Sequence, residues 1–90
     1  MSESVTDTLR ALLADHARLG VDVATLADTD DLYAAGMTSH ASVTMMLACE
    51  DEWDVEFPQH LLKKSTFASI AAIRDALAEL DVDGSAARTA

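Results

Sequence analysis

The chain is short, half apolar and strongly acidic. Its 90 residues, 50% of them hydrophobic, are enough for one folded domain with a single small core. The 16 Asp and Glu residues against 6 Lys and Arg give a formal net charge of −10, which disfavours nucleic acid and anionic membranes as partners and favours basic protein surfaces.

The lone cysteine, Cys49, excludes an internal disulfide and fits a reducing compartment. No signal peptide and no membrane-spanning apolar run is evident. We therefore expect a cytoplasmic protein, and we expect it to act as a monomer.

The first predicted helix shows apolar residues at helical spacing and is expected to end before Gly20. Its stripe consists of Val5, Leu9, Leu12, Leu13 and His16, and His16 is expected to pack against another helix. A long connection, residues 21–37, follows, with an acidic run and scattered apolar residues. In so small a domain, a connection of this length is expected to be packed down or functional.

The second predicted helix begins at Thr38 or Ser39, either of which can cap it, and runs to about Trp53. The expected core stripe is Ser42, Met45, Met46, Cys49 and Trp53, with Trp53 largely buried. A second stripe consists of Ser39, Val43, Leu47 and Glu50, and helical spacing places it on a separate face. We interpret this second face as an apolar anchor patch with a charged rim, suited to a partner protein. A plain N-cap at Ser39 and a second core stripe remain alternatives.

Pro58, the only proline, is expected to start a short helical segment that carries Leu61 and Leu62. The last helix is expected to open at Ser65 or Thr66. Its core stripe is Ile70, Ile73, Leu77 and Leu80. We place one domain at residues 1–82 and a disordered tail at 83–90. The predicted fold class is all-α: three main helices plus one short helix, a small four-helix bundle with a long loop between the first two helices.

The sequence predicts no catalytic site. Ser39 and His40 are neighbours, and neighbours on a helix point in different directions, so they cannot form a nucleophile and base pair. The serine-hydrolase motif G-x-S-x-G is also absent, because Ala41 stands at its second glycine.

The sequence predicts no metal site either. Asp28 and Asp30 could begin a calcium loop, but Leu32 and Tyr33 occupy the positions of the third ligand and the turn glycine. The three histidines lack a paired ligand spacing, and His60 is expected to be solvated. Cys49 is expected to be a small buried hydrophobe.

Two segments on either side of the second helix, DLYAAGMTS and EDEWDVEFP, resemble the acyl carrier protein family. That family reads roughly D-L-x-x-x-G-x-D-S-L, a helix, then E-x-x-F-x-[IV]-x-[IVF]-[PS]. The matching residues here are Asp31, Leu32, Gly36, Ser39, Glu50, Trp53, Val55, Phe57 and Pro58. The resemblance covers about residues 5 to 81 and implies an acyl-carrier-like bundle.

In this family a phosphopantetheinyl transferase attaches 4′-phosphopantetheine to the motif serine, and the resemblance makes that residue Ser39. The arm ends in a thiol that carries cargo as a thioester, and the protein itself is not an enzyme. Partner enzymes dock beside the serine. The residues that the resemblance implies for docking are Met37, His40, Val43, Thr44, Leu47, Glu50 and Asp51.

Two positions depart from the family pattern: Thr38 replaces Asp, and His40 replaces Leu. The string GMTSHASV is similar to bacterial stand-alone carriers that receive glycine or alanine from ATP-dependent amino acid:[carrier protein] ligases related to seryl-tRNA synthetases. We therefore expect a carrier of an activated amino acid. The alternatives are a fatty-acyl or polyketide carrier, or an acidic helical adaptor without a prosthetic group.

Overall fold

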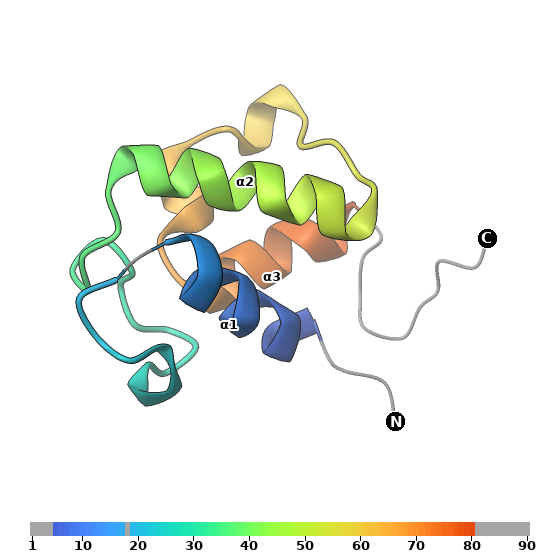
Figure 1. Ribbon diagram of the computed structural model, residues 1–90. Helices are drawn as coiled ribbons and strands as arrows, with labels where there is room; N and C mark the ends of the chain where they lie inside the picture. The colour runs from blue at the N-terminus through green and yellow to red at the C-terminus, as the bar shows by residue number, and fades with distance from the viewer. Residues whose placement is uncertain (1–4, 18, 81–90) are drawn as a thin grey trace.

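Three α-helices make up the frame of the computed structural model, which describes residues 5–17 and 19–80 (Figure 1). These helices are α1 (Val5–His16), α2 (Ser39–Trp53) and α3 (Ile70–Glu79). Short 3₁₀ helices lie between them: η1 (Val23–Thr25), η2 (Gln59–Leu61) and η3 (Lys64–Phe67). The described residues contain no strand, so the predicted all-α fold is confirmed. The bundle has three α-helices rather than four, because the short segment after Pro58 is the 3₁₀ helix η2.

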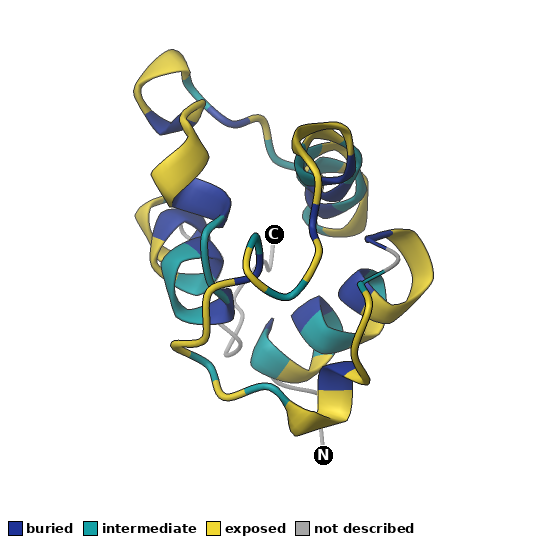
Figure 2. Ribbon diagram, turned by 90° about the vertical axis from the view of Figure 1, so that its left-hand side faces the viewer, coloured by how far each residue is buried: buried dark blue, intermediate teal, exposed yellow. Residues whose placement is uncertain are grey.

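The core lies where α1 packs against both α2 and α3. Figure 2 shows buried positions turned toward the interior of the bundle on each of these helices. The largest side chains with almost no exposure are Leu9, Leu13, Leu32, Met45, Cys49, Ile70, Ile73 and Leu77. Leu32 belongs to the connection between α1 and α2, so that connection supplies part of the core. The long loop is therefore packed against the core, which was one of the two roles expected for it.

Asp28 ties the same connection to two helices. Its carboxylate accepts a hydrogen bond from Arg10 of α1 at 2.7 Å and one from Arg74 of α3 at 3.2 Å. Its backbone carbonyl accepts from the Ala71 N–H at 2.8 Å. These bonds hold the connection against the first turns of α3 and leave little freedom to the segment that leads into α2.

The predicted start of α3 at Ser65 or Thr66 is wrong. The helix begins at Ile70, and the Ser69 hydroxyl caps it by accepting from the Ala72 N–H at 3.0 Å. Ser65 and Thr66 belong to η3, where Thr66 is buried. The Ala68 carbonyl accepts from the Leu32 N–H at 2.7 Å, and this bond to the loop holds the chain in a bend just before the helix.

Two predicted packing residues lie at helix ends and are less buried than expected. His16, the last residue of α1, is exposed and lines a shallow hollow with Leu12 and residues of α2. Trp53, the last residue of α2, is only partly buried, although it packs against the core. Along α2 the buried residues are Ala41, Met45 and Cys49, whereas Ser42 and Met46 are half-buried. The core stripe is therefore turned by about one residue from the predicted one.

The predicted core stripe of the last helix is confirmed in three of its four residues. Leu80 is partly buried, whereas the other members of its predicted stripe, Ile70, Ile73 and Leu77, are buried. The predicted domain boundary at residue 82 and the predicted tail at 83–90 lie outside the described residues. The described helices are too short or too polar to traverse a lipid bilayer.

Candidate functional site

A tight turn sets the position where α2 begins. The Asp31 carboxylate accepts the Tyr33 N–H at 2.9 Å and so starts the turn. Gly36 has a φ of 115°, and a Cβ there would lie 3.0 Å from the backbone nitrogen of Gly20. Only glycine tolerates both conditions. The Asp and Gly of the motif are thus explained by the path of the backbone.

Thr38 is the cap of α2, and Ser39 is not. The Thr38 side-chain oxygen accepts the Ala41 N–H at 3.0 Å from an extended backbone, the usual N-cap geometry. Ser39 is the first helical residue and is exposed. Its carbonyl accepts from the Ser42 hydroxyl at 2.7 Å, and its own hydroxyl bonds to none of the described residues. The plain N-cap interpretation of Ser39 is therefore wrong, and its hydroxyl is available to another molecule.

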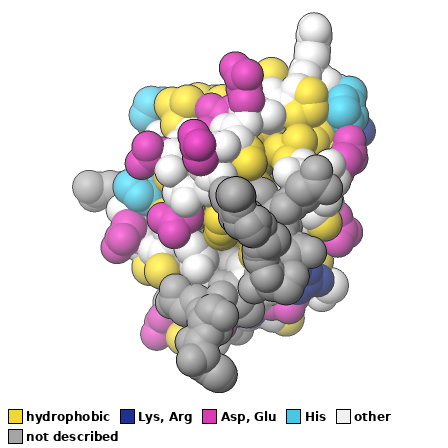
Figure 3. Space-filling view, turned by 90° about the vertical axis from the view of Figure 1, so that its right-hand side faces the viewer, with side chains coloured by type: hydrophobic (Ala, Val, Ile, Leu, Met, Phe, Trp, Pro, Cys, Tyr) yellow, Lys and Arg dark blue, Asp and Glu magenta, His cyan; other side chains and the backbone are white. Residues whose placement is uncertain are grey.

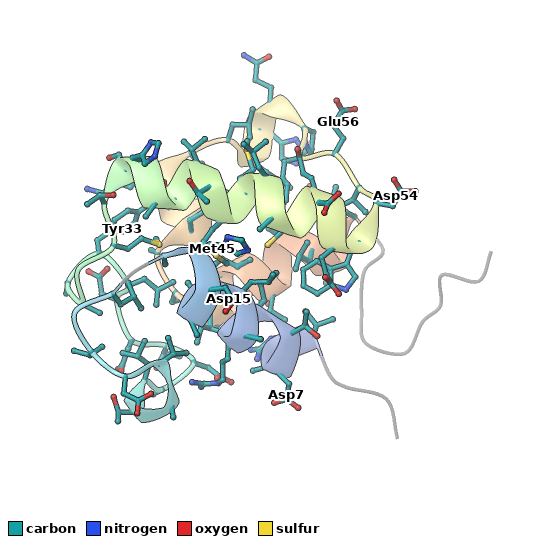
Figure 4. All side chains as sticks on the ribbon, viewed as in Figure 1. Asp7, Asp15, Tyr33, Met45, Asp54 and Glu56 are labelled. Carbon is teal, nitrogen blue, oxygen red and sulfur yellow. The ribbon has the colours of Figure 1, made fainter. Side chains whose placement is uncertain are left out.

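Ser39 opens onto an apolar groove of about 380 Å³. Its lining residues come from the loop before α2, from α2 and from the segment around η3: Tyr33, Ser39, Ser42, Val43, Met46, Leu62, Lys63, Lys64 and Phe67. Figure 4 shows Tyr33 below the start of α2. The sequence analysis missed this groove, because its walls come from segments far apart in the chain and no periodicity links them.

The face of α2 that carries Ser39 is exposed along its length, as predicted. Val43 is 51% exposed and Leu47 is 54% exposed, and because residues four apart are neighbours on a helix, the two form one exposed apolar patch. His40 and Asp51 are exposed as well, and Thr44 is half-buried, its hydroxyl bonded to the His40 carbonyl at 3.2 Å. Val43 and Leu47 are thus not a second core stripe.

Two of the residues predicted for docking have structural contacts instead. Met37 is only 3% exposed and belongs to the core, so its side chain offers almost no surface to a partner. The Glu50 carboxylate is half-buried and accepts the Phe57 N–H at 2.9 Å, which fixes the chain reversal after α2.

The same reversal explains the second half of the motif. Asp54 has a φ of 53°, in the left-handed region, and its N–H bonds to the Glu50 carbonyl. The chain then turns back, and the buried Phe57 ring packs against Phe67 with a centroid distance of 5.5 Å. In Figure 4, Met45 points into the bundle from α2, whereas Asp54 and Glu56 point away from it.

The other candidate residues either bond to neighbouring side chains or are buried. Asp28 is held by two arginines, which keep the pKa of its carboxyl below the usual value, so it is no free calcium ligand. Cys49 is buried as expected, and burial, helped by the Glu52 and Glu50 charges, raises the pKa of its thiol to about 12. His60 is exposed and contacts Glu79. Within residues 5–17 and 19–80, no group of three His, Cys, Asp or Glu side chains could hold a metal ion.

The fold and the site together define a class of protein. It is a small helical domain that presents an exposed serine hydroxyl, bonded to none of the described residues, at the start of a helix beside an apolar groove and an exposed apolar face. The family model for the phosphopantetheine attachment site matches residues 7–82. The chain therefore belongs to this family of carrier proteins, whose members bear 4′-phosphopantetheine covalently on a serine.

Known proteins of similar sequence and structure agree with the family. An aminoacyl carrier protein of Agrobacterium fabrum (strain C58) is 49% identical over 77 residues, which span 86% of this chain and 92% of that protein. The fold also matches a chain in crystal structures of an engineered Bradyrhizobium japonicum glycine:[carrier protein] ligase complexed with a carrier protein from Agrobacterium tumefaciens. In the AMP complex the TM-score is 0.79 at 48% identity, covering 81% of this chain and 97% of that one. In the ATP complex the TM-score is 0.81 at 47% identity, and the match covers 83% of this chain and 97% of the chain in the crystal structure.

Proposed function

We propose that the chain carries an activated amino acid of the glycine or alanine class as a thioester on a 4′-phosphopantetheine arm attached to Ser39. The observation that supports Ser39 most directly is its hydroxyl, which is exposed, bonded to none of the described residues and released from capping by Thr38. The amino acid cargo is supported by the 49% identity to an aminoacyl carrier protein. The single cysteine, which is buried and free, is consistent with a cytoplasmic protein.

The residues around Ser39 fit the prosthetic group. The serine stands at the N-terminus of α2, where the partial positive charge of the helix favours a phosphate. The adjoining groove has room for a flexible arm. The bound group would supply a thiol that moves freely in solution, which the protein lacks, because its own cysteine is buried.

The protein's part in the chemistry is to position the serine oxygen and to present a surface. His40, the neighbour of Ser39, leaves the helix in another direction and is not placed to act as a base toward it. In our proposal, a phosphopantetheinyl transferase therefore supplies the catalysis for attachment. An ATP-dependent amino acid ligase then activates the amino acid and loads the arm.

Both enzymes would dock on the exposed face of α2 formed by His40, Val43, Thr44, Leu47 and Asp51, which we call the α2 docking face. Val43 and Leu47 are its apolar anchors, since each offers exposed aliphatic area with no charge to desolvate. A carrier must leave its partner after each loading, so the interface should be small, below about 1,200 Å² in total. His40, where the family has Leu, would select among partners.

The test begins with coenzyme A and a phosphopantetheinyl transferase, followed by intact-mass measurement. Wild type should gain the mass of one phosphopantetheine group, and Ser39→Ala should gain none. The arm-bearing protein is then offered glycine or alanine with a ligase and ATP, and in parallel malonyl or fatty-acyl donors with their own transferases. Loading only by acyl donors would replace the amino acid cargo with an acyl cargo. No mass gain at all would indicate an acidic adaptor without a prosthetic group.

A further inference from the structure

Two adjacent lysines stand out in this acidic molecule because neither forms an ion pair with a carboxylate of the described residues. Of the described Lys and Arg side chains, Arg10 and Arg74 both pair with Asp28. Lys63 and Lys64 are exposed and take part in no ion pair with the described residues. At a net charge of −10, two adjacent cations without an ion-pair partner among the described residues are a local exception to the field of the whole protein, although Lys63 also borders a second hollow that Asp75 and Glu79 line.

The position of the lysines connects them with Ser39. Both line the groove onto which Ser39 opens, on the wall formed by η3 and the residue before it. Lys64 is held in place by Tyr33: its Nζ lies 4.8 Å from the ring centroid, and the Tyr33 hydroxyl donates to the Lys64 carbonyl at 3.1 Å. The aromatic ring therefore orients the charge without neutralising it.

We propose that Lys63 and Lys64 hold the phosphodiester on Ser39 and so draw the pantetheine arm into the groove when no partner enzyme is bound. This inference depends on the proposed attachment at Ser39. A phosphodiester carries one negative charge, and charge-assisted hydrogen bonds to ammonium groups are stronger than neutral ones. The start of α2 adds its own positive partial charge on the same side.

The rest of the groove suits the rest of the arm. Beyond the charged end, its walls are mainly the side chains of Val43, Met46, Leu62 and Phe67. A pantetheine chain has an apolar gem-dimethyl group and two amides, so it can lie on such a surface while its amides stay near solvent. Ser42 offers a hydroxyl on the same wall, although that group already bonds to the Ser39 carbonyl.

The resting position must also be easy to leave. Both lysines are exposed, and exposed ion pairs stabilise weakly and are screened by salt. A docking enzyme can therefore withdraw the arm. The lysine pair would favour a folded-back arm between encounters without trapping it.

The experiment compares amide chemical shifts of the apo and arm-bearing forms of the ¹⁵N-labelled full chain, together with ³¹P transverse relaxation of the arm-bearing form. In wild type, attachment should shift the amides of Tyr33, Lys63, Lys64 and Phe67 as well as those next to Ser39. In Lys63→Gln/Lys64→Gln the shifts should shrink to the neighbours of Ser39, and the ³¹P transverse relaxation should slow. Lys63→Arg/Lys64→Arg, which keeps both charges, should resemble wild type.

A salt titration of the wild-type arm-bearing protein gives a second measurement that needs no substitution. The groove shifts should fade as the screening length falls from about 10 Å at 0.1 M to about 3 Å at 1 M. Shifts confined to residues 38–42 in wild type, or unaltered in the Gln variant and by salt, would overturn the proposal. An absence of mass gain on Ser39 would instead overturn the proposed function, which the mass measurement detects first.

Discussion

Ser39 is available for modification because its neighbour supplies the helix cap. Thr38 accepts the Ala41 N–H at 3.0 Å, and the Ser39 hydroxyl is left exposed beside the groove. In the family pattern an Asp stands at position 38, and it could cap the helix with the same geometry. Threonine preserves the cap and removes a negative charge next to the serine. The departure at 38 therefore alters the electrostatics of the site and leaves its structure intact.

Because Thr38 caps the helix and Ser39 does not, substitutions at these two adjacent residues should have opposite effects on stability and attachment. Thr38→Ala should lower the free energy of unfolding by about 1 kcal/mol through loss of the cap, while Ser39 remains open to attachment. Ser39→Ala should leave stability almost unchanged and abolish the mass gain. Chemical denaturation and intact-mass measurement on both variants check this. A stability loss at Ser39 and none at Thr38 would reverse the assignment of the cap.

Cys49 allows a direct count of arm thiols. Its thiol is buried and its pKa is raised to about 12, so at pH 8 it stays protonated and shielded from a neutral alkylating reagent. Native apo protein should therefore incorporate no iodoacetamide label, and arm-bearing protein should incorporate one. After denaturation the counts should rise to one and two. Fast labelling of the native apo protein would show that Cys49 opens to solvent.

The helix α2 has two different apolar faces, one for the core and one for partners. Ala41, Met45 and Cys49 are buried in the core, while Val43 and Leu47 are about half exposed. A helix that is apolar on both sides has no clear amphipathic direction, and this is why the sequence left the second stripe open between core and docking surface. The structure shows that Val43 and Leu47 of this stripe are exposed, and the role of the stripe in docking is our proposal.

The docking role predicts that charge on this face blocks loading. Val43→Asp and Leu47→Asp should each reduce the rate of amino acid loading by tenfold or more, since about 1.4 kcal/mol of lost binding is tenfold. Both should fold normally, because the side chains are exposed. Val21→Asp is the matched control: Val21 is 45% exposed but lies on the loop after α1. Equal loading rates in all these variants would move the docking surface off α2.

Local signals in the sequence were sufficient for α1 and α2. Helical spacing marked both helices, and the hydroxyl pair at 38–39 marked the start of α2. The start of α3 was not predictable in this way, because Ser65, Thr66 and Ser69 are all competent caps. Contacts with the distant loop decide among them, above all the Leu32 N–H to Ala68 carbonyl bond. The groove beside Ser39 depends on the same long-range packing.

For the whole molecule, Asp28 is the point where loop, α1 and α3 are joined. Its hydrogen bonds to Arg10 and then to Arg74 lower the pKa of its carboxyl from 3.8. A lowered pKa in the folded state means that the stabilisation is fully present above pH 3.8 and is lost as the pH falls through the folded-state value. Acid should therefore loosen the long loop.

Asp28→Asn tests this dependence. Its melting temperature should be below that of wild type at pH 7. The difference should narrow as the pH falls from 3.8 through the lower folded-state pKa, where the wild-type carboxyl in the folded protein also becomes neutral. Asp15→Asn, on the exposed surface of α1, is the matched control and should melt no lower than wild type. A difference between Asp28→Asn and wild type that is constant with pH would assign the effect to packing rather than to charge.

The net charge of −10 also acts on the molecule as a whole. Asp and Glu side chains are spread over much of the face seen in Figure 3, which looks at the end of the bundle where α2 ends. Their mutual repulsion opposes the compact state. Salt at 0.15 M ionic strength limits the range of this repulsion to about 8 Å. The melting temperature should therefore rise with sodium chloride.

Asp51→Asn/Glu52→Gln, which neutralises two exposed carboxylates on α2, should raise the melting temperature at low salt and flatten its salt dependence. A wild-type melting temperature that is flat from low to high salt would show that the folded arrangement already balances the repulsion, with the paired arginines at Asp28 as the main compensating contacts.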